Sequence, residues 1–268
     1  MTFEKLINIA ILSLVIGIIL TICLFLRGRF AANFKSIFKE SLNVKLDNRY
    51  VILFALLLIP AVVYILKNLD KDVLLYIYFI AGFLILGPVG YILTRNKAVL
   101  LSGLIYPVLY FNYWNTYTFN LIAVLLAISL ILLISNIISW SVLKLLFVLL
   151  MIMDIALVFI TRDMVAFGHK ILVLQIPILI HIPFGEGVSI GLGDIFITGL
   201  LSLGFTKEKE FSYNRSLRFV WIIAALFFII LYLVNAYLPH QMYPATIFVG
   251  LSFIGAIVLT GYTLCRKT

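Results

Sequence analysis

The sequence predicts an all-α, polytopic membrane protein with nine transmembrane helices. Of its 268 residues, 64% are hydrophobic and only 12% are charged, whereas soluble domains carry about 45–50% apolar and about 25% charged residues. The apolar residues form unbroken runs, such as Leu6–Leu26, and do not alternate with polar residues as in a membrane β-barrel. These observations exclude a soluble globular domain, a disordered chain and a disulfide scaffold.

Charged or polar turns divide the chain into nine apolar runs, and a membrane-crossing helix needs roughly 20 such residues. No small-residue cleavage site follows the first run, so we expect it to be retained as a span and not removed as a signal peptide. The predicted spans are 6–26, 50–66, 73–93, 98–113, 119–138, 142–160, 188–205, 217–238 and 244–264. We expect one membrane domain over residues 1–268, with a possible six-helix part (1–160) and three-helix part (188–268).

The connections between these spans are short, with two exceptions. A basic loop, 27–49, follows the first span, and a longer connection, 161–187, precedes the seventh. Within the longer connection, the stretch Gln175–Pro183 is rich in β-branched residues, is bounded by prolines and is too short to span. It predicts a strand or a re-entrant segment beside the seventh span, with a plain interfacial loop as the alternative.

Two acidic residues lie inside predicted spans: Asp154 in the sixth and Asp194 in the seventh. An ionisable residue within a span is costly and is a functional hypothesis by default. Asp154 comes eight residues before Arg162, and Asp194 comes eight residues after Glu186, so each is predicted about 12 Å in from the same side at 1.5 Å per residue. This matched depth predicts a pair of carboxyl groups that act together.

A carboxylate pair suits hydrolysis, because two neighbouring acids share a proton. The ionised partner can activate water as a general base, and the protonated partner can polarise a carbonyl group. The alternatives are an ion- or proton-coupled transporter that uses the same two acids, and a structural pair in which each acid bonds to a serine or threonine. Small residues near the second acid, Gly187, Gly191 and Gly193, favour close helix packing or admission of a substrate strand.

The segment Gly191-Leu192-Gly193-Asp194, with Asp154 in the sixth span and a proline motif opening the ninth, resembles the presenilin and signal peptide peptidase family of GxGD intramembrane aspartyl proteases. The resemblance extends over the nine-span plan and is strongest over Met151–Thr246. It implies an aspartic endopeptidase that cleaves peptide bonds within membrane helices or remnant signal peptides. The short chain resembles a compact microbial homologue that works without accessory subunits.

The resemblance also implies the site residues. Asp154 and Asp194 are the expected catalytic dyad, and no metal or organic cofactor is expected. Two positions depart from the family pattern: Met153 stands where the family has tyrosine, and Thr246 where it has leucine. The expected substrate-binding residues are Gly191, Leu192, Gly193, Pro244, Ala245, Thr246 and Met153.

Proline has no amide proton, so Pro244 would leave carbonyl groups free to hold an extended substrate segment; a simple helix start is the alternative. A prepilin-peptidase-like GxGD enzyme is the other protease considered, although Asp194 is not followed by the lysine of that motif. The segment Gly187–Gly191 fits the G-x-S-x-G nucleophile pattern, but that pattern requires a strand–turn–helix setting in a soluble sheet.

Basic residues predict the orientation in the membrane, because lysine and arginine concentrate in cytoplasmic loops. We expect the N-terminus outside and the C-terminus in the cytoplasm, hence substrates whose own N-terminus is cytoplasmic. The net charge of +9 is attributed to loops that face anionic lipid, and no nucleic-acid partner is expected. Of the 20 lysines and arginines, the five on the side of the N-terminus are Lys5, Lys67, Lys71, Arg162 and Lys170.

Overall fold

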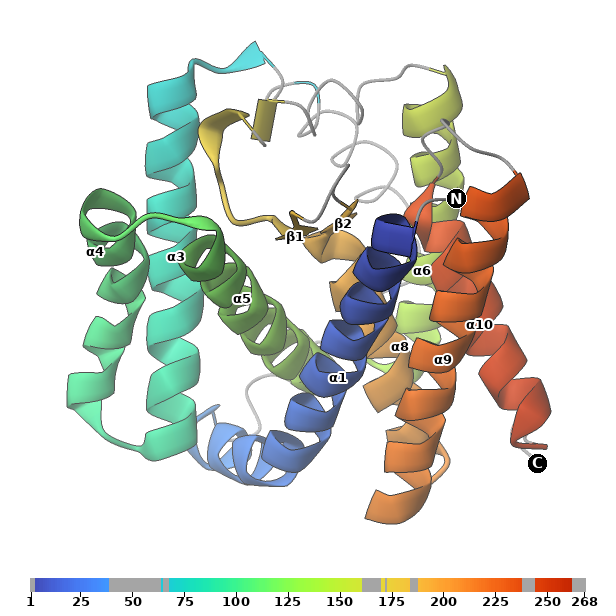
Figure 1. Ribbon diagram of the computed structural model, residues 1–268. Helices are drawn as coiled ribbons and strands as arrows, with labels where there is room; N and C mark the ends of the chain where they lie inside the picture. The colour runs from blue at the N-terminus through green and yellow to red at the C-terminus, as the bar shows by residue number, and fades with distance from the viewer. Residues whose placement is uncertain are drawn as a thin grey trace.

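The computed structural model describes residues 3–38, 64, 68–160, 170–171, 173–183, 188–237 and 244–261. These residues are mostly helical, with one two-stranded hairpin (Figure 1). Among them, five helices are long and apolar enough to cross a membrane, and two shorter apolar helices accompany them. The protein is therefore a helical, membrane-embedded protein. The second predicted span, 50–66, lies almost wholly outside the described residues.

The helices and strands follow in chain order. They are α1 (Phe3–Phe38), α3 (Lys71–Thr94), the 3₁₀-helix η1 (Lys97–Leu104), α4 (Ile105–Asn112), α5 (Thr116–Ile137), α6 (Trp140–Ile155), the π-helical turn η2 (Ala156–Ile160), β1 (Leu179–Ile182), β2 (Val188–Gly191), α8 (Leu192–Glu208), α9 (Tyr213–Tyr237) and α10 (Ala245–Leu259).

Three of the predicted spans agree closely with helices α3, α5 and α9. The first span differs, because α1 continues through Phe38 into the segment expected to be a loop. Phe30 and Phe34 are buried on this extension, and Asn33 Nδ2 donates to the Ile92 carbonyl of α3 at 2.7 Å. These contacts explain why the basic segment stays helical and, as Figure 1 shows, turns across the lower end of the bundle.

The fourth predicted span is not one regular helix. Residues Lys97–Leu104 form the eight-residue η1, and Ile105–Asn112 form the eight-residue α4. A 3₁₀-helix rises about 2.0 Å per residue and an α-helix about 1.5 Å, so the two together reach about 28 Å, close to the ~30 Å hydrocarbon thickness. Glycines let η1 lie against α3: a Cβ atom on Gly87 would stand 2.8 Å from the Leu100 carbonyl oxygen.

The core lies between α1 and its neighbours. Helix α1 packs against α9 and α5, and α8 packs against α5 and α10. A Cβ atom on Gly17 would lie 2.8 Å from the Trp221 ring, and one on Gly199 would lie 2.4 Å from Ile131. Close helix approach at glycines is how membrane helices gain van der Waals contact without a hydrophobic driving force.

The hairpin lies beside the start of α8. Strands β1 and β2 pair antiparallel, with Leu179 opposite Gly191. The pairing continues past β2, because the Leu192 N–H, at the first residue of α8, donates to the Ile178 carbonyl at 2.8 Å. The strand expected within Gln175–Pro183 is therefore present as β1. The seventh span, expected to be helical from residue 188, instead begins as a strand and becomes a helix at Leu192.

A single side chain fixes the other edge of β1. Asn120 of α5 donates from Nδ2 to the His181 carbonyl at 2.7 Å, and its Oδ1 accepts from the His181 N–H at 2.9 Å. An asparagine side chain thus replaces a neighbouring strand at this residue. Because α5 carries the asparagine, the hairpin is held in register against the helical bundle.

Candidate active site

The first predicted acid, Asp154, lies one residue before the end of α6, where the chain changes to the π-helical turn η2. Its side chain is half-buried. Its Oδ2 accepts a hydrogen bond from Thr246 Oγ1 at 2.7 Å and a longer one from the Thr246 N–H at 3.3 Å. Short π-helical turns inside helices occur frequently at functional sites. The contact ties the end of α6 to the start of α10.

The second predicted acid, Asp194, is the third residue of α8. Carboxylates are favoured at this position, because the exposed backbone N–H groups of a helix N-terminus carry partial positive charge. No side chain caps this helix end: Gly191 is the N-cap residue, with extended backbone. A Cβ atom at Gly191 would come within 3.0 Å of Asp194 Oδ2. The glycine therefore leaves room for the carboxyl group.

The two acids occupy the same region of the fold. Helix α6 packs against α8, and both pack against α10. Figure 1 shows the last turns of α6, the start of α8 and the hairpin at one end of the bundle, the end at which α1 begins.

Asp194 does not lie at the depth predicted from the sequence, which placed it two helical turns into the seventh span. Residues 188–191 are instead an extended strand, so Asp194 lies in the first turn of α8. A strand rises about 3.3 Å per residue, more than twice the rise of a helix. The depth calculation for Asp194 was therefore wrong.

The glycines and Leu192 of the GxGD segment have separate surroundings. Leu192 is buried and joins the hydrophobic core. Gly193 is exposed, and a Cβ atom there would meet no other atom within 4 Å. Beside the other acid, Met153 is half-buried, and its carbonyl accepts from the Ala156 N–H where α6 passes into η2. Open space next to Asp194 thus lies on the Gly193 side.

The proline motif lies at the start of α10. Pro244 is the N-cap residue, and its carbonyl accepts from the Ile247 N–H at 3.3 Å. This geometry is that of a helix start, the alternative considered for Pro244. The carbonyl groups that a proline would free belong to residues before 244, outside the described residues. Of the motif, Thr246 is the residue that contacts an acid, and Ala245 is half-buried beside it.

Two polar residues that hold the hairpin were not identified from the sequence as site residues. Asn120 holds the hairpin, as described above, and His181 Nδ1 forms a 2.8 Å hydrogen bond with Ser189 Oγ across it. Asn120 could have been noticed as a polar residue in the first turns of an apolar span. The histidine and serine fall opposite each other only once the strand register is known.

The pairing of Ser189 with His181 does not create the G-x-S-x-G site. In that motif the serine stands on the turn between strand and helix. Here Ser189 is the second residue of β2, three residues before α8 begins. The serine and histidine face each other on an antiparallel pair, which explains their bond without a nucleophilic role.

Comparison with protein-family models, with curated proteins and with solved structures gave no match to this chain.

Proposed function

We propose that the protein is an intramembrane aspartyl endopeptidase of the presenilin and signal peptide peptidase type, with nine transmembrane helices and with Asp154 and Asp194 as its dyad. The substrates are helical segments of membrane proteins or remnant signal peptides. No metal or organic cofactor takes part, and no accessory subunit is required.

One observation carries this proposal: three polar groups lie on three helices that all pack against one another. Asp154 is near the end of α6, Asp194 is in the first turn of α8, and the Thr246 hydroxyl, which donates to Asp154, is at the start of α10. A membrane-embedded carboxyl group is costly, and bringing two together adds repulsion between like charges. Such an arrangement is expected where the pair performs chemistry.

The chemistry follows from one shared proton. The ionised carboxylate removes a proton from water as the water oxygen attacks the peptide carbonyl carbon. The protonated partner donates to the carbonyl oxygen, which gives a neutral tetrahedral diol. The carboxyl group that took the proton from water then donates it to the peptide nitrogen, and the C–N bond breaks. Its partner, now ionised, takes a proton back from the diol, which restores the starting state. Thr246 holds Asp154 in position throughout.

A substrate must present an extended backbone, and β2 offers an edge for it. In an antiparallel pair, alternate residues exchange hydrogen bonds, and the residues between them point their N–H and C=O groups outward. The bond from Leu192 to Ile178 fixes the alternation, so Ser189 and Gly191 point outward. The Gly191 carbonyl, at the N-cap, accepts the first hydrogen bond of α8, so the groups left for pairing are the Ser189 N–H and C=O and the Gly191 N–H. A substrate strand that pairs with them lies directly before Asp194.

Substrate direction depends on the predicted orientation. With the N-terminus outside and the C-terminus in the cytoplasm, the site accepts helices whose own N-terminus is cytoplasmic. Remnant signal peptides have that direction.

The decisive experiment measures cleavage fragments of a helical membrane substrate by the purified chain in detergent. Asp154→Asn and Asp194→Asn should each abolish cleavage while thermal unfolding stays close to that of the parent, because asparagine keeps the hydrogen-bonding capacity. Asp72→Asn, an acid in the first turn of α3, is the matched control and should cleave normally.

Other functions give different outcomes. A coupled transporter shows no proteolysis in the parent, and the same two variants lose coupled flux in proteoliposomes. A structural pair shows unfolding in both variants and no activity to lose. Cleavage that survives both substitutions rules out the dyad.

A further inference from the structure

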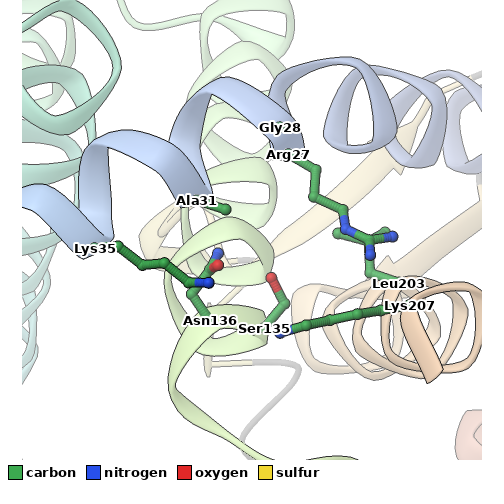
Figure 2. Close-up of a pocket in the computed structure, with 8 residues that line it drawn as sticks. All are labelled: Arg27, Gly28, Ala31, Lys35, Ser135, Asn136, Leu203 and Lys207. Carbon is green, nitrogen blue, oxygen red and sulfur yellow. The ribbon is translucent and has the colours of Figure 1, made fainter. Parts of the chain in front are cut away.

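The bundle has a second polar site at the end opposite the hairpin. The ends of α1, α5 and α8 enclose a pocket of about 140 Å³ (Figure 2), well above the roughly 10–15 Å³ that holds one water. Three cationic side chains line it, Arg27, Lys35 and Lys207, together with the polar Ser135 and Asn136. Figure 2 shows the Lys35 and Lys207 side chains extending from opposite sides toward the end of α5.

These cations are not neutralised by the part of the chain that the structure describes. The hydrogen-bond partner of the Arg27 guanidinium is neutral: its Nη1 donates to Thr206 Oγ1 at 3.3 Å. Lys207 lies beyond the predicted seventh span, and burial together with the charges of Arg27 and Lys35 lowers the pKa of its ammonium group. Three like charges around one cavity repel one another, and an anion bound between them would relieve that repulsion.

The pocket is held by fixed structure. Phe30 and Phe34 anchor the tail of α1 in the core on either side of the turn that carries Ala31. Asn33 joins this tail to α3 through the Ile92 carbonyl, and Arg95 donates to the Asn33 carbonyl at 3.2 Å. The backbone positions of Arg27 and Lys35 are therefore set before any ligand arrives.

A larger, mostly apolar cavity of about 230 Å³ adjoins the basic pocket. The two share Ser135 and Lys207. Glu208 also borders the larger cavity, beside Lys207. Its other lining residues are Ile134, Ile138, Ser139, Trp140, Leu143, Leu200 and Gly204. A basic pocket joined to an apolar one fits a ligand with an anionic head and a hydrocarbon portion.

We propose that the basic pocket binds a phosphate group, supplied by the head of an anionic phospholipid whose chain enters the apolar cavity, or by a free phosphate. Lysine, arginine, hydroxyl and amide groups are the donors that phosphate oxygens accept. Basic pockets between membrane helices on the cytoplasmic side bind anionic head groups, and this end of the bundle is the predicted cytoplasmic side. The proposal does not depend on proteolysis.

The test is a binding titration on the purified full chain in detergent, followed by thermal unfolding. The probes are short-chain phosphatidylglycerol, short-chain phosphatidylcholine and inorganic phosphate. The pocket variant is Lys35→Gln with Lys207→Gln. The control is Arg29→Gln with Lys97→Gln, which removes the same charge from exposed residues outside the pocket lining.

Phosphatidylglycerol should raise the unfolding temperature of parent and control. The pocket variant should bind it about 30-fold more weakly, which is about 2 kcal/mol for two lysines at ~1 kcal/mol each. If inorganic phosphate binds as tightly as phosphatidylglycerol, the ligand is a free phosphate; if it binds far more weakly, the ligand is a lipid. Equal binding of phosphatidylcholine, an equal loss in the control, or unchanged binding in the pocket variant overturns the proposal.

Discussion

The bond between Thr246 and Asp154 gives the sharpest prediction. Thr246→Val removes the hydroxyl and keeps the shape of the side chain, so the 2.7 Å donor to Asp154 is lost while the 3.3 Å backbone donor remains. A hydrogen bond to a charged group contributes about 1.5–3 kcal/mol, which corresponds to about 10-fold to 150-fold in rate. Because Asp154 is half-buried, water can partly replace the hydroxyl, so the lower end applies. We expect kcat/KM to fall about tenfold.

The assay is fragment formation from a helical membrane substrate, with thermal unfolding measured on the same preparations. Thr246 is 7% exposed, and a valine methyl group fits the same buried volume, so stability should change by only about 1 kcal/mol. Thr246→Ser restores the donor and should recover most of the activity. If Thr246→Val cleaves like the parent, or if Thr246→Ser loses as much activity as Thr246→Val, the hydroxyl does not position Asp154 for catalysis.

Three further predictions concern the space beside Asp194, the hairpin and the orientation in the membrane. Gly193→Ala should fold as well as the parent, because its Cβ meets no atom, but should cleave more slowly if substrate occupies that space; parent-like kinetics would refute this. Asn120→Leu should lower the free energy of unfolding by about 1–3 kcal/mol, since both backbone groups of His181 lose their partner. It should also speed hydrogen exchange in β1, and unchanged exchange would show that Asn120 does not hold the hairpin. Cysteines placed at Lys5 and Lys267 should label from outside intact cells at position 5 only, and the opposite pattern would reverse the substrate direction.

Apolar runs bounded by polar or charged clusters were enough to predict most of the helices. The third, fifth and eighth predicted spans agree with α3, α5 and α9 within a few residues, because a polar or charged cluster bounds each. Asn115 is the clearest case: it caps α5 through both Tyr117 and Thr118 N–H groups. Local chemistry of this kind is readable before any tertiary contact is known.

The misjudged elements are those decided by tertiary contacts. The basic segment after span one looks like a loop from its charges, but buried phenylalanines keep it helical through Phe38. Residues 97–104 look like an ordinary apolar helix, but they wind as a 3₁₀-helix against α3, where Gly87 and Gly103 admit their backbone. Neither outcome follows from local periodicity, since both depend on which partner the segment packs against.

The same distinction applies to the candidate site. The two acids could be identified as candidate site residues from the sequence, because a carboxyl group within an apolar run has few structural explanations. Their geometry could not, because residues 188–191 are β-branched and small as well as apolar, and a short apolar run fits a strand or a helix equally. The pairing with β1 decides in favour of a strand. That outcome places Asp194 at a helix N-terminus, directly after the outward-pointing backbone groups of β2 that the proposed function assigns to an extended substrate.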